Sequence, residues 1–363
     1  MGSNLDQCSD VVVVEQGSVR VDLLGGTLDL DPISLIVPQV VTVNLATSLM
    51  VRVKIQKSEL SSAADDVVNS VIFRSRDYCQ DAKLVAEDFT SKDVLFHQRE
   101  WGVLNFPLQI LLEFPYESLR GLSIEVDSDI PTGSGLGGSS AMGVTLYRAL
   151  AKVTGRRVSP LQVINTVKGV ESRILRAGPA GYQDYYPAIY GGILALLPRP
   201  GEIKLEQLFT PSLQHFLQSH LTLIYCGKSR YSGTNNWEIY KAFFDGNDQI
   251  REKLEAIART SYSGLQAIRA SKYDQLLSCI AEEGEIRKSL APAIVIDEVA
   301  DFYGVLRSRS KGILGMKVCG AGGGGCFLLL HYEGMRDEIL QQLQLPEFSF
   351  MRQLDFSILP PLP

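Results

Sequence analysis

The sequence predicts an α+β fold with two lobes. Its 363 residues exceed what one hydrophobic core usually serves. β-branched runs in the first forty residues predict strands, whereas polar–apolar patterns over 236–284 and about 288–310 predict long helices. Glycine-rich runs lie between a strand and a helix at 130–143 and between two strands near the end of the chain. We place the lobe boundary at the "RPGE" turn, which gives domains of 1–200 and 201–363.

The N-terminal part of the chain is a series of predicted strands. "VVVV" (11–14) and "SVRVDLL" (18–24) predict two strands, and the turn "GGTLD" follows them. "VTVNLATSLMVRVKIQ" (41–56) predicts a further pair of strands. "LSIEVDSDIP" (122–131) alternates apolar and polar residues up to a proline, which predicts a strand that ends where the first glycine run begins.

Two helices are predicted after this glycine run. Apolar residues recur at helical spacing from the run to Gly155, and a second helix begins with Ser159 as N-cap and Pro160 in its first turn and ends at Gly178. The loop "GPAGYQDYYPAIYGG" follows. Three later segments predict strands, the last of them a pair around the second glycine run: "ILALLP" (193–198), "LTLIYCG" (221–227) and "GMKVCGAGGGGCFLLLHY" (315–332).

Composition argues against several classes of protein. A formal net charge of −6 argues against a broad nucleic-acid footprint. The apolar segment 34–53 is interrupted by polar residues, short of the ~18 uninterrupted apolar residues of a membrane span, so we expect a core strand and no membrane partner. The N-terminus lacks signal-peptide features, which makes the cytoplasm the expected location. The six cysteines and four histidines are dispersed and predict neither a disulfide framework nor a metal site.

The run "IPTGSGLGGSSAMG" (130–143) satisfies GxGxxG, but its context does not fit a dinucleotide site. No acidic residue occurs between Asp129 and Glu171 to bind a ribose, and a P-loop would need lysine where Ser139 stands. Glycines that let the backbone approach an anion, followed by a helix N-terminus, still suit a phosphate group. The alternative is a glycine-rich turn with serine caps and no ligand.

A family resemblance begins at this run. "PTGSGLGGSSA" resembles the PxxxGLGSSA signature of the GHMP kinases, which include galactokinase, homoserine kinase, mevalonate kinase and related sugar kinases. "GSVRVDLLGGTLDL" (17–30) is similar to the N-terminal substrate motif of that family, and "KVCGAGGGGCFLLL" (317–330) to its C-terminal glycine loop. The resemblance implies an N-terminal lobe like domain 2 of ribosomal protein S5, a ferredoxin-like C-terminal lobe, and ATP with Mg²⁺ as cofactors.

The resemblance also implies which residues bind ATP and its metal ion. Mg²⁺ would be bound by Ser139 and Glu171. Glu171 lies on a largely apolar helix face, where an unpaired carboxylate is costly and a cation would compensate, although an ion pair with Arg173 is an alternative. The residues implied to bind the ATP phosphates are Gly133, Ser134, Gly135, Leu136, Gly137, Gly138, Ser139 and Ser140.

Asp184 is the candidate catalytic base. It lies in a loop of glycines, aromatic residues and proline, and loops of this kind carry functional sites. The corresponding family loop resembles "KQDQY", in which the aspartate accepts the proton of the substrate hydroxyl. A nearby arginine would keep Asp184 ionised, and Arg20 of the N-terminal motif is the candidate. The alternative is that Asp184 only forms a turn beside Gln183.

The candidate acceptor-binding residues come from three segments. Galactokinase has glutamate and histidine where this chain has Gly26 and Thr27, which argues against galactose. Asp29 corresponds to an aspartate that binds sugar hydroxyls, and its alternative role is a turn cap. The loop Gly320 to Gly325 indicates close approach of a backbone or ligand, with a flexible hairpin as the alternative. The full candidate set is Gly26, Thr27, Asp29, Asp184, Arg230, Gly322 and Gly323.

These features predict an ATP-dependent sugar kinase. "GGTLDL" and "QDYYPAIYGG" resemble the heptose 7-phosphate kinases of bacteria and the fucose-type kinases, so the expected acceptor is the anomeric hydroxyl of a heptose 7-phosphate or related sugar. The alternatives are another GHMP kinase, like galactokinase, fucokinase or mevalonate kinase, and a non-catalytic regulator that binds sugar or nucleotide. The expected partner is a small sugar or sugar phosphate, and a homodimer stays open.

Overall fold

The computed structural model describes residues 11–57, 69–90, 101–175, 180–229 and 234–363. The chain forms two compact units that interleave along the sequence, whereas the predicted domains divide the chain once; that division stays a prediction. Unit 1 comprises Met1–Gly17, Met50–Asp129 and Ser139–Ile174, and unit 2 comprises Ser18–Leu49, Ile130–Gly138 and Leu175–Pro363.

Two long strands run through both units. Strand β1 (Val11–Leu24) and strand β2 (Thr42–Lys57) are each continuous, so the prediction of two strands in each of these segments was wrong. The reason that each strand continues is the alternation of buried side chains along it. Buried apolar residues stand at odd-numbered positions at both ends of each strand, so no turn changes the alternation; they are Val13, Val19, Val21 and Leu23 in β1 and Val43, Leu45, Val51, Val53 and Ile55 in β2.

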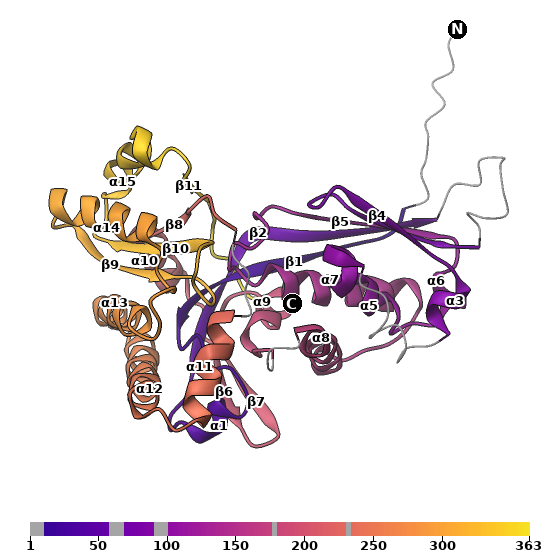
Figure 1. The fold of residues 1–363 in the computed structure, drawn as a ribbon, viewed down its shortest axis with the longest axis horizontal. Coiled ribbons are helices and arrows are strands. Elements are labelled where there is room, and N and C mark those ends of the chain that lie inside the picture. Colours follow the sequence, from indigo (N-terminus) through magenta and orange to yellow (C-terminus); the bar gives the residue numbers. More distant parts are fainter. Residues whose placement is uncertain (1–10, 58–68, 91–100, 176–179, 230–233) are drawn as a thin grey trace, which may run out of the picture. The chain divides into compact units, whose positions relative to one another are not determined.

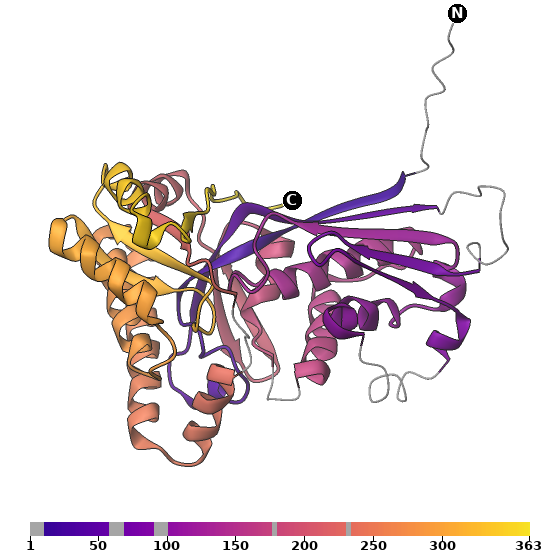
Figure 2. The same ribbon diagram turned by 45° about the horizontal axis from the view of Figure 1, so that its top comes forward.

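Unit 1 packs helices on one face of a sheet (Figure 1, Figure 2). Strand β5 (Leu122–Ser128) pairs antiparallel with Val51–Lys57 of β2 and parallel with β3 (Val71–Ser75), which pairs with β4 (Gln80–Leu84). The helices on that face are α5 (Asn105–Leu111), α7 (Gly138–Val153) and α8 (Pro160–Leu175), and the shorter helices of the unit are α3 (Ala86–Phe89) and α6 (Tyr116–Leu119).

The two predicted helices of unit 1 are confirmed. Ser159 and Gln162 form a capping box at the start of α8: the Ser159 hydroxyl accepts from the Gln162 amide at 3.3 Å, and the Gln162 side chain accepts from the Ser159 amide at 2.8 Å. The predicted end of this helix, Gly178, lies outside the described residues. A Cβ on Gly143 would lie 2.6 Å from Val167, so α7 and α8 are in close contact.

Unit 2 contains a four-stranded antiparallel sheet in the order β11 (Arg352–Gln353), β8 (Leu221–Tyr225), β10 (Cys326–His331) and β9 (Ile313–Val318). Helix α13 (Tyr273–Lys288) packs against β9, and α12 (Asp248–Arg269) packs against α13. Elsewhere in the unit, Thr42–Leu45 of β2 pairs with β6 (Ile193–Arg199), which pairs with β7 (Glu202–Gln207). The strands predicted at 122–131, 193–198, 221–227 and 315–332 are thus confirmed.

The long helical patterns of unit 2 are divided more finely than predicted. The pattern 236–284 forms three helices because it is broken twice. At the first break Gly246 has a positive φ, and the Asn247 side chain caps a new helix by accepting from the Ile250 amide. At the second break Ser271 has a positive φ. The helices of this unit are α1 (Ile33–Ile36), α9 (Pro187–Tyr190), α10 (Pro211–His220), α11 (Thr234–Phe244), α12 (Asp248–Arg269), α13 (Tyr273–Lys288), α14 (Asp297–Arg309) and α15 (Arg336–Leu343).

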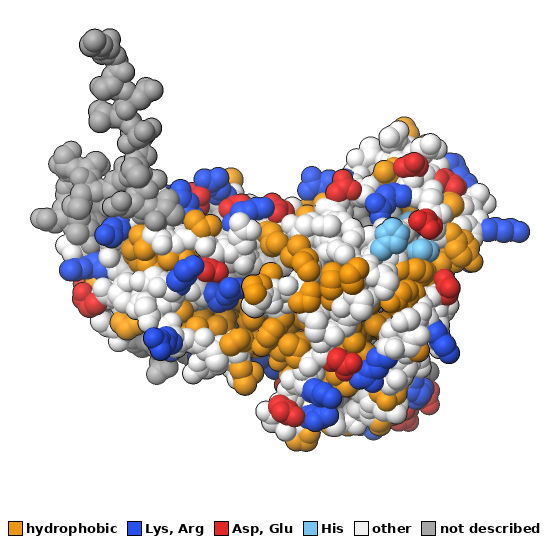
Figure 3. Space-filling view, turned by 180° about the vertical axis from the view of Figure 1, so that it is seen from behind, with side chains coloured by type: hydrophobic (Ala, Val, Ile, Leu, Met, Phe, Trp, Pro, Cys, Tyr) orange, Lys and Arg blue, Asp and Glu red, His pale blue; other side chains and the backbone are white. Residues whose placement is uncertain are grey.

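The surface carries mixed charge. On the face in Figure 3, basic and acidic side chains are interspersed over the described residues rather than gathered into a field of one sign. Among the helices of the described ranges, none combines the length and apolarity that crossing a bilayer requires.

Candidate active site

Strand β1 and the turn Gln183–Tyr185 bring Arg20 and Asp184 together in unit 2. Arg20 donates from Nε to Asp184 Oδ1 at 2.8 Å, and its Nη2 lies 2.7 Å from the same oxygen. Arg20 is 3% exposed and Asp184 28%, so the carboxylate can meet a ligand while its partner is buried. Burial opposes the charged guanidinium, but Asp184 and then Asp22 outweigh it and raise the pKa of Arg20.

The predicted phosphate loop lies against this pair. Arg20 donates from Nη1 to the Gly135 carbonyl at 2.6 Å and from its backbone amide to the Leu136 carbonyl at 3.0 Å. A Cβ on Gly137 would lie 3.3 Å from Asp184, and Gly137 has a φ of +71°. The backbone therefore passes close to Asp184 with no side chain between them.

The first turn of α7 places two serines differently. The Ser140 hydroxyl is buried and donates to Glu171 Oε2 of α8 at 2.9 Å, whereas Ser139 is exposed. The described residues contain no cluster of three His, Cys, Asp or Glu side chains that could hold a metal ion. A serine hydroxyl beside a carboxylate still fits Mg²⁺, which prefers oxygen ligands and is commonly bound by one or two carboxylates together with water and phosphate. The assignment of Ser139 and Glu171 to Mg²⁺ stays a prediction.

Asp29 lies under the loop that carries Asp184. Its Oδ2 accepts from the Gln183 amide at 3.4 Å, its carbonyl accepts from the Tyr182 amide at 3.2 Å, and a Cβ on Gly181 would collide with its carboxylate. Burial, followed by the negative charges of Asp184 and Asp22, raises the pKa of Asp29 to about 6. The surroundings of Asp29 therefore favour the protonated form of its carboxyl group.

The remaining candidate residues lie in two turns of unit 2. Thr27 is buried with a φ of +78°, a conformation that few threonines adopt, and Gly26 precedes it. The Gly323 amide donates to the Ile294 carbonyl at 3.0 Å, and a Cβ on Gly322 would lie 2.5 Å from the same oxygen. The glycine loop is thus packed against the backbone at Ile294. Arg230 lies outside the described residues.

Two amides beside Asp184 were missed by the sequence reasoning. Asn44 Nδ2 donates to the Gln183 carbonyl at 3.3 Å, while Asn44 Oδ1 and Gln183 Oε1 are buried without a protein hydrogen-bond partner among the described residues. Such acceptors are normally satisfied by water or a ligand hydroxyl. Asn44 could have been found as a lone amide inside the apolar run "VTVNLA".

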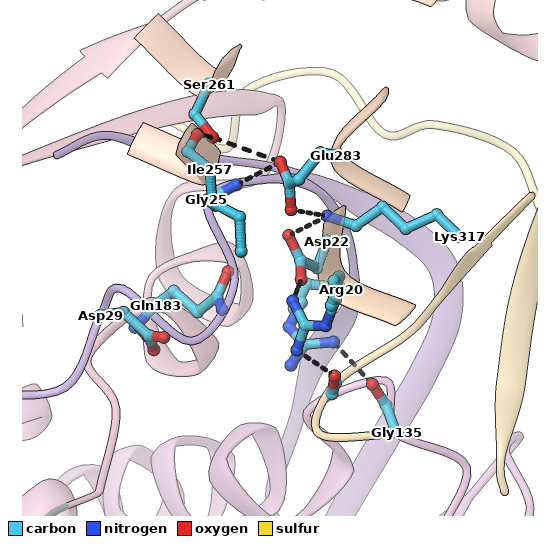
Figure 4. A network of polar contacts seen from close by, with 12 residues as sticks. Arg20, Asp22, Gly25, Asp29, Gly135, Gln183, Ile257, Ser261, Glu283 and Lys317 are labelled. Carbon is cyan, nitrogen blue, oxygen red and sulfur yellow. Dashed lines mark hydrogen bonds and ion pairs between the residues drawn. The ribbon is translucent and has the colours of Figure 1, made fainter. Parts of the chain in front are cut away.

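Sequence reasoning also missed a buried network of charges in unit 2 (Figure 4). Asp22 lies 3.3 Å from Lys317 Nζ and 3.4 Å from Arg287 Nη1, and Lys317 lies 2.5 Å from Glu283. Burial opposes ionisation of Asp22, but Lys317, Arg287 and Arg20 outweigh it and lower its pKa, whereas burial raises the pKa of Glu283. The signal was Asp22 itself, which shares one face of β1 with Arg20.

The fold of the chain is that of the GHMP kinases, and the α+β prediction is confirmed. The family model described as "GHMP kinases N terminal domain" matches residues 105–192. The mevalonate kinase of Methanothermobacter thermautotrophicus is 27% identical over 63% of this chain and 70% of its own length. The bifunctional fucokinase/GDP-fucose pyrophosphorylase of Arabidopsis thaliana is 24% identical over 61% of this chain and 21% of its own length.

Solved structures of the same fold match nearly the whole chain. A mevalonate kinase of Methanococcus jannaschii aligns with a TM-score of 0.72 and 18% identity, covering 98% of this chain and 100% of its own. A D-glycero-D-manno-heptose 1-phosphate kinase from Bacteriodes thetaiotaomicron aligns with a TM-score of 0.68 and 16% identity, covering 96% of each chain. The chain therefore shares its fold with kinases of both mevalonate and sugars.

Proposed function

We propose that the chain is an ATP-dependent kinase that transfers the γ-phosphate to a sugar hydroxyl, the anomeric one of a heptose 7-phosphate or related sugar. The observation that carries this proposal is the Arg20–Asp184 pair held against the Gly135 carbonyl of the glycine run. A half-buried carboxylate beside a glycine-rich turn is what phosphoryl transfer to an alcohol needs, namely a base next to a phosphate-binding backbone.

The chemistry divides among four groups of residues. Asp184 orients the acceptor hydroxyl and accepts its proton, and Arg20 holds that carboxylate in place through its ion pair. Backbone amides of the glycine run and the start of α7 hold the phosphates. Ser139 and Glu171 are the proposed ligands of Mg²⁺, which when bound supplies neutralisation of phosphate charge. Ser140 holds the Glu171 carboxylate through its hydroxyl.

Polar groups around Asp184 favour a polyol as the acceptor. Asp29 after β1, Asn44 of β2 and Gln183 beside Asp184 supply one carboxylate and two amide oxygens, and both amide oxygens are buried with no hydrogen-bond partner among the described residues. A sugar has several hydroxyl donors that could meet them. A mevalonate-type kinase is the second candidate, because the 27% identical relative is a mevalonate kinase.

A coupled assay of ADP release tests both candidates. The acceptor panel contains heptose 7-phosphate, heptose 1-phosphate, fucose, galactose and mevalonate, each with Mg²⁺-ATP. The proposal expects turnover of a phosphorylated heptose above that of mevalonate, and NMR of the product locates the new phosphate. Turnover of mevalonate alone would establish the second candidate. ATP binding without turnover of any acceptor would favour a regulator instead.

A further inference from the structure

Four charged side chains are buried together beside the turn 25–29, which we name the acceptor turn, and Figure 4 labels three of them: Asp22, Glu283 and Lys317. Asp22, Glu283 and Lys317 are 0% exposed, and Arg287 is 2% exposed. Burying charges in this way gives little net stability, because desolvation offsets the attraction between them. The network does fix the relative positions of the segments it joins, and these segments are the ones that carry the candidate site.

Arg287 of α13 joins the acceptor turn to the glycine loop. Its Nη1 lies 3.4 Å from Asp22 Oδ2, and its Nη2 donates to the carbonyl of Gly320, the first residue of the loop. A Cβ on Gly26 would collide with both Asp22 Oδ2 and Arg287 Nη1. The pair therefore occupies the space behind Gly26 and explains physically why this position has no side chain.

The other end of the glycine loop is attached to the phosphate loop. The Cys326 amide donates to the Ser134 carbonyl at 2.7 Å, and a Cβ on Gly325 would lie 2.6 Å from the same oxygen. Between the two ends, Gly323 is bonded to Ile294. The loop thus connects the segment proposed to bind ATP with the segment proposed to bind the acceptor.

Lys317 and Glu283 hold the acceptor turn at its first residue, Gly25, and at Asp22 of the strand before it. Glu283 Oε2 accepts from the Gly25 amide at 2.7 Å and from the Ser261 hydroxyl at 3.2 Å, and its Oε1 lies 2.5 Å from Lys317 Nζ. Lys317 also contacts Asp22. The start of the turn and the strand before it are therefore fixed by one carboxylate and one ammonium group.

We propose that Arg287 is a positioning residue for phosphoryl transfer. It sets the spacing between the acceptor turn at Gly26 and the glycine loop at Gly320, and through that loop the spacing to Ser134. The expected kinetic effect rests on the proposed function. Whether Arg287 anchors the glycine loop can be tested without turnover. Small displacements of a reacting group are costly: about 1 Å can lower the rate by about 10²-fold.

Arg287→Met tests the proposal by hydrogen–deuterium exchange and by kinetics. We expect faster amide exchange in peptides covering 24–30 and 319–326, and a fall of about 10²-fold in kcat/KM for the acceptor. The KM for Mg²⁺-ATP should change much less, because Ser134 keeps its bond to Cys326. Arg287→Lys keeps the charge and one donor group, so it should restore part of the acceptor kcat/KM.

The matched control is Arg307→Met, which removes an exposed arginine that also donates to a carbonyl, that of Ile313, at 2.8 Å. Equal exchange rates in both methionine variants, or wild-type acceptor kinetics in Arg287→Met, would overturn the proposal. If Arg287→Met does not fold, Arg287→Lys with unchanged exchange and kinetics would overturn it as well. If the wild-type chain phosphorylates no acceptor, the proposed function fails while the exchange rates still decide whether Arg287 anchors the loop.

Discussion

Asp184 combines two properties that are seldom found together. It is bonded to an almost fully buried arginine, yet more than a quarter of its side chain is exposed. An ion pair with one buried partner contributes little net stability, because desolvation offsets the attraction, so its geometry is better explained by a task at the exposed part of the carboxylate. The proposed task is to accept a proton from the acceptor hydroxyl.

Asp184→Asn should therefore lower kcat by about 10²–10⁴-fold while the Kd of Mg²⁺-ATP stays near that of the wild type, because the amide keeps the shape and loses the base. Single-turnover assays and isothermal titration calorimetry measure the two quantities. The matched control is Glu206→Gln, which breaks an exposed bidentate pair with Arg269 in the same unit. Normal turnover in Asp184→Asn would contradict the assignment of the base.

From the raised pKa of Asp29 we expect acceptor binding to depend on pH. Because its pKa is raised to about 6, the carboxylate that would accept sugar hydroxyls is protonated at lower pH. We expect kcat/KM for the acceptor to fall as the pH is lowered through about 6, and this titration to be absent in Asp29→Asn. A profile that is the same in both proteins would show that Asp29 does not contact the acceptor.

The raised pKa of Asp29 also affects the free energy of unfolding, which should fall as the pH rises, whereas acceptor kcat/KM should increase. A carboxyl group whose pKa is raised on folding favours the folded state when protonated, so its contribution is lost as the pH rises from about 4 through about 6. Asp29→Asn should therefore lose less unfolding free energy than the wild type over this range. Urea unfolding at several pH values measures the difference.

At the scale of elements, the bond between Ser140 and Glu171 connects the start of α7 with α8. We expect Ser139→Ala to raise the Mg²⁺ concentration for half-maximal activity about tenfold or more, as loss of a metal ligand does, and Ser140→Ala to raise it less by releasing Glu171. Titration of Mg²⁺ at saturating ATP distinguishes them. An effect confined to Ser140→Ala would make Ser140 the ligand, and no effect in either variant would remove the metal site from this turn.

The elements that the sequence predicted well are those whose signal is local. The capping box at Ser159 and the glycine loop between β9 and β10 depend on neighbours in the sequence. The buried network could not be predicted, because Arg287 and Lys317 resemble ordinary surface residues until the fold places them beside Asp22. Continuous β1 and β2 were missed because polar residues and a glycine interrupt their apolar runs without ending the strands.

At the scale of the whole molecule, ligand binding should stabilise the folded chain. Mg²⁺-ATP at about 100 times its Kd should add about 2.7 kcal/mol to the free energy of unfolding, because only the folded state offers the site. Differential scanning calorimetry with ATP, with and without excess EDTA, measures the shift in Tm. A transition that does not move with Mg²⁺-ATP, or that is indifferent to EDTA, would contradict the proposed cofactors.

The buried network also bears on how the chain reaches its fold. Asp22 and Lys317 are 295 positions apart, and Arg20 and Asp184 are 164 apart, so these contacts close very long loops and are expected to form late. During synthesis β1 emerges long before β9. Arg20 and Asp22 place two charges among the apolar residues of β1, and charges inside apolar strand segments are the residues that oppose aggregation before such long-range contacts form.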